Sequence, residues 1–296
     1  MRMDGLQLDT LRLGRLRERL NGKKPLSEPA HYAQRRPVYR GGSSCIYEVR
    51  DPQRPDDPFA IKVLHSEYVN DRRSVRQFYR EAIATAYIEH PHIVTGLSEA
   101  GFIDDRPLFA MELLDGKILR QSLTRMGVIP RTLPWQQIRP IALQLCDALD
   151  AVHAAGLVHA DVKPDNVMLV KDGNTVKLFD FGCTSEIGEF GGDPVWGTAD
   201  YMSPEHVHGF GLDAYSDIYS LGVVLYEILC GSRPFEGSNS RHTLQMHLQE
   251  PPQPPQQLNS AISDRVQTLI LRALEKDPVR RFQNMQEMAE AIKACP

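Results

Sequence analysis

Residues 159–166 read His159-Ala160-Asp161-Val162-Lys163-Pro164-Asp165-Asn166, and Asp180-Phe181-Gly182 begins fourteen residues after the asparagine. Transfer of a phosphoryl group needs a carboxylate for the proton of the attacking hydroxyl and a cation for the developing charge. It also needs an amide and a second carboxylate for Mg²⁺. Asp161, Lys163, Asn166 and Asp180 supply these groups in that order. Either stretch alone could be an ordinary turn, but the pair at this spacing favours a phosphoryl-transfer site.

Length, composition and charge limit the classes of protein to consider. The 296 residues are 42% hydrophobic, which is enough for one large domain or two lobes. A net charge of −4 gives no basic field for nucleic acid, so we expect no nucleic-acid partner. The longest apolar run, near residues 221–225, is far short of the roughly 20 residues that span a bilayer, so we expect no integral membrane segment. The first twenty residues lack the apolar stretch of a signal peptide.

Five widely spaced cysteines, without a Cys-x-x-Cys pair, indicate neither a disulfide framework nor a zinc site. A reducing, cytoplasmic setting is therefore expected.

The order of expected elements changes along the chain. Residues 1–36 form a basic, leucine-rich extension, in which a short amphipathic helix is expected to end near Asn21-Gly22. The extension packs on the adjoining lobe, stays mobile, or docks on a membrane surface or a partner. Two β-like runs at 44–49 and 58–64 flank a hairpin loop, and a helix at 75–88 ends before Pro91. Strand-like stretches at 93–95 and 108–113 complete a small sheet. Long helices predominate after Asp115.

These features resemble a eukaryotic-type Ser/Thr protein kinase, most similar to the bacterial members of that family, over about residues 38–294. The resemblance implies an α+β fold with two lobes: a small antiparallel sheet with one main helix over 37–113, and a larger, mostly helical lobe over 114–296. It implies ATP and Mg²⁺ as cofactors, with ATP in a cleft. The implied reaction transfers the γ-phosphate of ATP to Ser or Thr hydroxyls of a protein substrate, with autophosphorylation.

The resemblance also implies which residues bind ATP in the smaller lobe. Phe59-Ala60-Ile61-Lys62-Val63 is similar to the family's lysine strand, so Lys62 would hold the α- and β-phosphates and pair with Glu81, nineteen residues later. Backbone groups of Glu112 and Leu114 would bind adenine, with Met111 behind the base and Ile46 and Ala60 pressing on it. Asp115 would reach the ribose, or is simply a polar turn residue. The phosphate-covering turn comprises Gly41, Gly42, Ser43 and Ser44, but Tyr39 and Ser44 stand where the family has glycines.

In the larger lobe, the resemblance makes Asp161 the group that accepts the proton of the acceptor hydroxyl or orients that hydroxyl. Lys163 would be a cation for the γ-phosphate, and Asn166 and Asp180 would be the Mg²⁺ ligands. In the family, an arginine usually stands at position 160 and pairs with a phosphate on the activation segment. Ala160 cannot form that pair, so the commonest reason to expect activation by phosphorylation of this segment is absent. Thr198 would bridge Asp161 and Lys163. The resemblance also pairs Glu205 with Arg281 and has Asp217 brace the catalytic loop, which together favour a protein substrate.

Two other functions stay open. The altered glycine turn, and Thr85 on the helix that carries Glu81, suggest a nucleotide-binding scaffold with weak or no catalysis, and a small-molecule kinase is the third reading. Thr184 and Ser185 are the expected autophosphorylation sites, because we expect their hydroxyls to be exposed. The sequence indicates no oligomeric state.

Overall fold

The computed structural model describes residues 35–51, 54–97, 101–125, 129–130, 132–170, 173–188 and 197–296. The expected helix in residues 1–36 lies outside these ranges, as do Glu189 and Asp193 of the expected activation segment. The chain divides into two compact units. One comprises residues up to His90 together with Val94–Leu114, and the other comprises Pro91–Ile93 and Asp115–Pro296.

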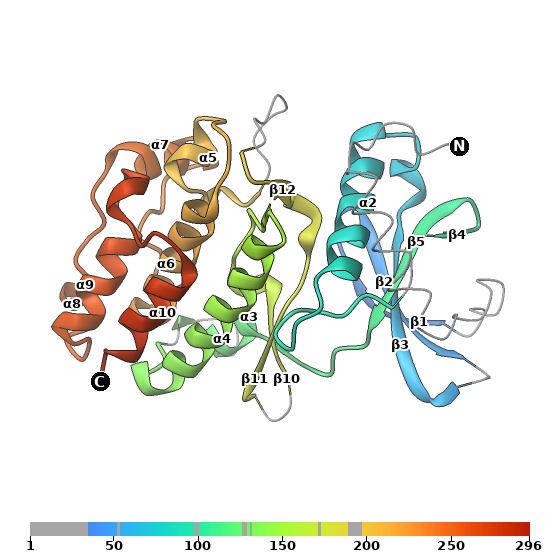
Figure 1. Cartoon of the computed structure of the whole chain (residues 1–296), viewed down its shortest axis with the longest axis horizontal. Helices are drawn as coiled ribbons and strands as arrows, with labels where there is room; N and C mark the ends of the chain where they lie inside the picture. Colours follow the sequence, from blue (N-terminus) through green and yellow to red (C-terminus); the bar gives the residue numbers. More distant parts are fainter. Residues whose placement is uncertain are drawn as a thin grey trace. The chain divides into compact units, whose positions relative to one another are not determined.

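The first unit is a five-stranded antiparallel sheet with one long helix, α2 (Figure 1). The strand order is β1-β2-β3-β5-β4. The elements are β1 (Arg35–Arg40), β2 (Ser44–Asp51), β3 (Arg54–Leu64), the short 3₁₀ helix η2 (Ser66–Tyr68), α2 (Arg72–Tyr87), β4 (Gly101–Ile103) and β5 (Arg106–Glu112). Helix α2 begins at a cap, because the carboxylate of Asp71 accepts hydrogen bonds from the backbone N–H groups of Arg73 and Ser74.

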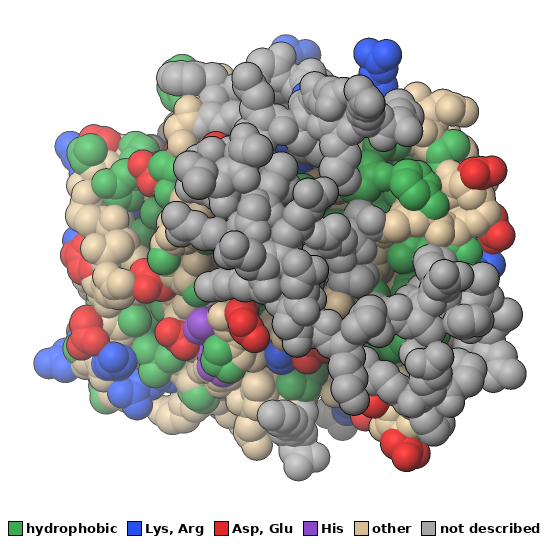
Figure 2. Space-filling model, turned by 45° about the vertical axis from the view of Figure 1, so that its right-hand side comes forward, with side chains coloured by type: hydrophobic (Ala, Val, Ile, Leu, Met, Phe, Trp, Pro, Cys, Tyr) green, Lys and Arg blue, Asp and Glu red, His purple; other side chains and the backbone are tan. Residues whose placement is uncertain are grey.

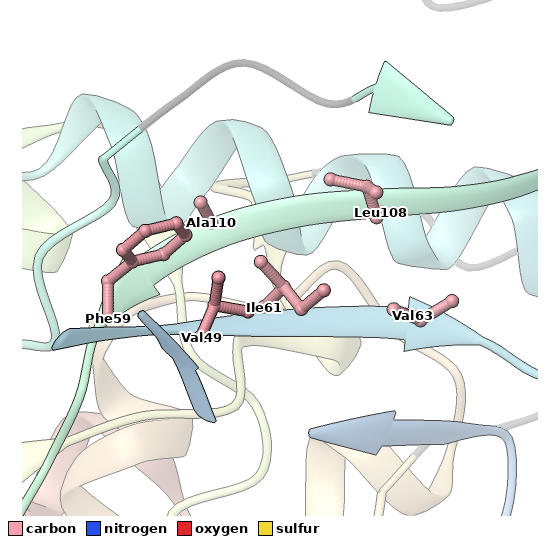
Figure 3. Packing of buried hydrophobic residues seen from close by; sticks show 6 residues of the cluster. All are labelled: Val49, Phe59, Ile61, Val63, Leu108 and Ala110. Carbon is pink, nitrogen blue, oxygen red and sulfur yellow. The ribbon is translucent and has the colours of Figure 1, made fainter. Parts of the chain in front are cut away.

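Alternation along the strands gives the sheet two different faces. Figure 3 shows one of them, on which buried side chains from β2, β3 and β5 pack together: Val49, Phe59, Ile61, Val63, Leu108 and Ala110. On the opposite face, Leu64 and Phe109 pack against Phe78 and Ala82 of α2. Lys62 lies opposite Phe109 in the β3–β5 register, so it shares this second face with the residues that hold the helix.

The expected strand at residues 93–95 is wrong. Ile93, which belongs to the second unit, forms only an isolated parallel bridge with Leu178 of the same unit, and the side chain of Lys177 donates to its carbonyl oxygen at 3.2 Å. Gly101–Ile103 takes the place of the expected strand at the sheet edge, paired with β5. The hairpin strands also run further than expected, to Asp51 and from Arg54.

The second unit is built mainly from helices. Its elements are β6 (Gly116–Ile118), α3 (Leu119–Leu123), β7 (Thr124–Arg125), β8 (Ile129–Pro130), α4 (Trp135–Ala154), β9 (Leu157–Val158), η3 (Pro164–Asn166), β10 (Val167–Val170), β11 (Thr175–Leu178), η4 (Phe181–Cys183), β12 (Ser185–Glu186), η5 (Ala199–Tyr201), α5 (Pro204–Val207), α6 (Ala214–Cys230), α7 (Ser240–Gln249), α8 (Pro255–Leu258), α9 (Asp264–Ala273), η6 (Pro278–Arg280) and α10 (Met285–Lys293).

Helix α6 forms the centre of this unit, since all but four of its seventeen residues are buried. It packs against α4 and α9, and α10 packs against α4 (Figure 1). A helix that is apolar nearly all round can be satisfied only in such a position. It ends at Gly231, whose φ of 79° lies in the left-handed region that glycine adopts without cost. The rigid centre supports the short strands and turns that carry the candidate catalytic residues.

Candidate active site

The side chains of Lys62 and Glu81 form an ion pair inside the first unit. The ammonium of Lys62 donates to both carboxylate oxygens of Glu81, at 2.6 and 2.7 Å, and the two side chains are only 13% and 7% exposed. The sheet strand β3 supplies the lysine and α2 supplies the glutamate. The pairing predicted from their separation of nineteen residues is therefore present, and it fixes the direction of the ammonium.

The turn between β1 and β2 is held by backbone hydrogen bonds and by a histidine. Gly41 N–H donates to the carbonyl oxygen of Ser44 at 2.9 Å, and His65 N–H donates to that of Ser43 at 2.8 Å. The ring Nε2 of His65 lies 3.1 Å from the carbonyl oxygen of Gly41. A Cβ added to Gly42 would meet no atom within 4 Å. The turn is thus ordered although it lacks two of the family's glycines, and the contact of His65 with it was not predicted.

The last residue of β5, Glu112, forms two hydrogen bonds with Thr95. Glu112 N–H donates to the carbonyl oxygen of Thr95 at 2.9 Å, while a carboxylate oxygen of Glu112 accepts from Thr95 N–H at 2.7 Å. The N–H of Glu112 is therefore in use. Asp115 is exposed, and Thr85 is buried, with its carbonyl oxygen bonded to Gly96 N–H at 3.1 Å.

Four hydrogen bonds hold the carboxylate of Asp161 in the second unit. One oxygen accepts from the backbone N–H and the hydroxyl of Thr198, at 3.0 and 2.9 Å. The other accepts from the ammonium of Lys163 at 2.6 Å and the amide of Asn166 at 3.1 Å. Lys163 also donates to the Thr198 hydroxyl at 2.7 Å, so Thr198 bridges the two charged groups as predicted. An incoming hydroxyl can bind Asp161 only by replacing one of these donors.

The surroundings of Lys163 favour its charged form. Burial alone would lower its pKa, but the carboxylates of Asp161 and Asp180 outweigh that effect and raise the pKa above the ordinary lysine value. The side chain is 18% exposed. The charged ammonium of Lys163 therefore interacts with the carboxylates of Asp161 and Asp180.

A backbone hydrogen bond from Phe179, the residue before Asp180, links the segment of Asp180 to Asn166. Asn166 donates its side-chain N–H₂ to Asp161, which leaves its amide oxygen as the atom for a cation, and its backbone carbonyl accepts from Phe179 N–H at 3.0 Å. Asp180 follows directly, with φ of 65°. An amide oxygen and a carboxylate are hard oxygen ligands of the kind Mg²⁺ takes, so these residues fit that ion.

Asp217 of α6, which is fully buried, holds the start of the catalytic loop, residues 159–166. Its two carboxylate oxygens accept from the backbone N–H groups of His159 and Ala160, both at 2.9 Å. Burial would raise the pKa of Asp217, but hydrogen bonding and charge from His153 lower it below its usual value. Ala160 has φ of 63°, a conformation that costs a non-glycine residue about 1–2 kcal/mol. Asp217 therefore stabilises a strained turn.

Gly197 allows Thr198 to approach this loop. Its φ is 115°, and an added Cβ would lie 3.1 Å from the carbonyl oxygen of Ala160.

The predicted pair of Glu205 and Arg281 is also present. Arg281 is fully buried and donates to both carboxylate oxygens of Glu205, at 2.8 and 2.9 Å.

The expectation that Thr184 is exposed is wrong. Its side chain is 5% exposed, and its hydroxyl has no hydrogen-bond partner among the described residues. Thr184 follows the 3₁₀ helix η4 directly, and its N–H donates to the carbonyl oxygen of Phe181 at 3.1 Å. The next residue, Ser185, lies opposite Val158 in the β12–β9 pair and is half-buried. Nearby, Ala160 packs with Val158 and Leu212.

Sequence reasoning missed a polar network around Asp165. Arg120 of α3 donates to Asp165 and to Glu227, and it also contacts the hydroxyl of Tyr201. The partners lie 45, 107 and 81 residues from Arg120. A charged residue in an amphipathic helix gives no local signal of such contacts, so only the fold could reveal them.

Comparison with known proteins agrees with this geometry. The protein kinase domain family matches residues 32–292. The chain belongs to the protein kinase family. It is 39% identical over 256 residues to serine/threonine-protein kinase PknB of Mycobacterium leprae, covering 84% of this chain and 40% of that protein. It is 35% identical over 265 residues to a probable serine/threonine-protein kinase of Clostridium perfringens, covering 88% of this chain and 38% of that protein.

A third relative is PknB of Mycobacterium tuberculosis, 37% identical over 278 residues, which are 89% of this chain and 43% of that protein. The predicted resemblance to bacterial kinases and the two-lobed α+β fold class are confirmed. This protein kinase chain spans about two-fifths of the length of these relatives. Within the described ranges, none of its helices is both long and apolar enough to cross a membrane.

Proposed function

We propose that this chain transfers the γ-phosphate of ATP to Ser or Thr hydroxyls of protein substrates. The observation that carries the proposal is the set of four hydrogen bonds on Asp161, which bring a carboxylate, an ammonium and an amide together. Family membership and the names of the relatives, which are serine/threonine-protein kinases, support the same reaction. A cytoplasmic location suits five cysteines that are all free thiols.

Each residue then has a defined task. Asp161 orients the acceptor hydroxyl and takes its proton, and it does so by exchanging one of its present donors for the substrate. Lys163 remains charged and stabilises the γ-phosphate. Lys62, directed by Glu81, binds the α- and β-phosphates. The backbone of the Gly41–Ser44 turn lies over the phosphates, and Met111, Glu112, Leu114, Ile46 and Ala60 contact the base.

Asn166 and Asp180 would hold Mg²⁺, which neutralises phosphate charge when it is bound. The amide of Asn166 is turned by its bonds to Asp161 so that its oxygen is the ligand, and a carboxamide in the reverse orientation could not serve.

The platform after the catalytic loop favours a protein as acceptor. Thr198 ties that segment to Asp161, and the Glu205–Arg281 pair fixes its far end. A small-molecule kinase has no need for such a segment. The scaffold alternative loses its main support, because the turn that lacks two glycines is ordered and the Lys62–Glu81 pair is intact.

The test is transfer of label from [γ-³²P]ATP by the purified chain to a generic protein acceptor and, separately, to a pool of small metabolites. Acid hydrolysis of the labelled protein should give phosphoserine and phosphothreonine, and EDTA should abolish the transfer. Label that enters only metabolites would replace the proposal with the small-molecule reading. Binding of ATP without transfer to any acceptor would favour the scaffold.

A further inference from the structure

Tyr39 carries an exposed aromatic ring at the edge of the sheet in the first unit. The residue lies in β1, two positions before the Gly41–Ser44 turn, and it is 57% exposed. Exposure of one ring carries little by itself, because Figure 2 shows other hydrophobic side chains at the surface of the molecule. The face of the sheet on which the ring lies is more informative.

A β-bulge in β1 decides that face. Pro37 pairs with Tyr47, which packs against the buried cluster shown in Figure 3. Residues two apart in a regular strand share a face, so without a bulge Tyr39 would pair with Cys45 on that same side. The register shifts between Pro37 and Tyr39, and Tyr39 pairs with Ile46 instead. The extra residue in β1 thus turns Tyr39 to the opposite face of the sheet.

On that opposite face, Tyr39 lies in one row with Lys62. The register partners are Tyr39 with Ile46, Ile46 with Lys62, and Lys62 with Phe109. Side chains of directly opposed residues project from the same face. Because neighbouring strands lie about 4.8 Å apart, the backbone of Tyr39 is roughly 10 Å from that of Lys62, with Ile46 between them. A ligand that Lys62 and Ile46 both contact therefore comes within reach of the Tyr39 ring.

The ring also lies beside the turn after β1. A Cβ added to Gly41 would lie 3.4 Å from Cε1 of Tyr39, so the ring extends along the strand toward the turn. The backbone of that turn is held by the hydrogen bond from Gly41 N–H to Ser44 and by the contact of His65 with the Gly41 carbonyl oxygen. The ring thus has an ordered neighbour on one side, and more than half of the residue stays accessible for a ligand to cover.

We propose that the ring of Tyr39 packs on the ribose of the bound nucleotide, at a position where the family has glycine. The inference rests on the proposed function, in which Ile46 contacts the base and the Gly41–Ser44 turn lies over the phosphates. Tyr39 is the neighbour of both, and the ribose is the part of ATP that joins the base to the phosphates. A tyrosine ring offers a flat apolar face to the carbon atoms of a sugar.

The experiment measures the Kd of the full chain for MgATP and for adenosine by isothermal titration calorimetry. Tyr39→Ala should raise both Kd values at least about fivefold, because both ligands carry the ribose that covers the ring. Tyr39→Phe keeps the ring, so both of its Kd values should stay within about twofold of the wild type. In steady-state assays, Tyr39→Ala should raise KM for ATP with little change in kcat, because a ribose contact is equally strong in the ground state and the transition state.

Phe102→Ala is the matched control. Phe102 is also 57% exposed and lies in the same sheet, but it belongs to β4, the edge strand farthest from β1. Loss of an exposed aromatic ring at this edge should leave both Kd values unchanged.

Three outcomes overturn the proposal while leaving the proposed function intact. If the ring only obstructs the turn, Tyr39→Ala binds MgATP as tightly as the wild type or more tightly. If the ring contacts the phosphates instead of the ribose, Tyr39→Ala weakens MgATP but not adenosine. Equal losses in Tyr39→Ala and Tyr39→Phe would show that the hydroxyl, and not the ring, makes the contact. A wild-type chain that binds no MgATP would remove the basis of the proposed function and of this inference together.

Discussion

Replacement of Arg281 by methionine should destabilise the second unit severely. All five N–H groups of this fully buried arginine have acceptors: both oxygens of Glu205, and the backbone carbonyl oxygens of Tyr215, Glu275 and Lys276, at 2.7 to 3.1 Å. Methionine fills the volume but leaves a buried carboxylate and three carbonyl groups without that partner. Breaking a buried ion pair from one side costs about 3–5 kcal/mol, a large part of the 5–15 kcal/mol typical of a folded domain.

Urea unfolding followed by tryptophan fluorescence measures this effect, because Trp135 is buried in α4 of the same unit. Arg280→Met, at the adjacent residue, is the control. Arg280 is 71% exposed and lies 3.9 Å from Asp277, so its replacement should lower the free energy of unfolding by less than about 0.5 kcal/mol. Adding Glu205→Leu to Arg281→Met should recover about 2 kcal/mol, since no charge is then left unpaired. Equal losses in Arg280→Met and Arg281→Met would refute the reasoning.

Three further results are expected. Glu81→Gln should lower kcat/KM for ATP at least about tenfold, because it removes the partner that directs Lys62, whereas exposed Glu67→Gln should not; equal rates in both variants would contradict this. Burial and the charge of Arg281 lower the pKa of Lys276 to about 8. Between about pH 8 and 9.5 the unfolded state therefore binds more protons, the free energy of unfolding rises with pH, and urea titrations of Lys276→Met should show a flatter profile. Thr184→Val should raise the free energy of unfolding by up to about 1 kcal/mol, because it removes a buried hydroxyl without a partner among the described residues; a loss of more than 1 kcal/mol in thermal or urea unfolding would be inconsistent with that burial.

The sequence predicted the contacts that follow from short motifs with fixed spacing. Lys62 and Glu81 lie on a strand and the helix after it, so their meeting depends on one small unit. Thr198, Asp161 and Lys163 meet as the family pattern implies, although 37 residues separate the threonine from the aspartate. In each case the chemistry requires those residue types, so the residues themselves carried the signal.

Other features depend on packing that no local pattern records. Thr184 is polar and lies in a segment rich in charges, so exposure was the natural expectation, yet its side chain is buried between η4 and β12 in the sequence. Residues 93–95 are all β-branched, which is typical of a strand. They lie where the chain passes between the two units, and Ile93 forms only an isolated bridge. Arg120 gave no sign of its partners, because the acids it joins are assembled by tertiary structure alone.

The most direct test of the account is single-turnover phosphoryl transfer by Asp161→Asn beside the wild type, with ATP binding measured separately. Asparagine keeps the shape of the side chain but cannot take a proton, so the rate should fall at least about a hundredfold while the Kd for ATP changes little. Asp150→Asn, a half-buried position on α4 whose carboxylate accepts a hydrogen bond from Gln286, should keep the wild-type rate. An Asp161→Asn protein that transfers phosphate as fast as the wild type would contradict the central claim.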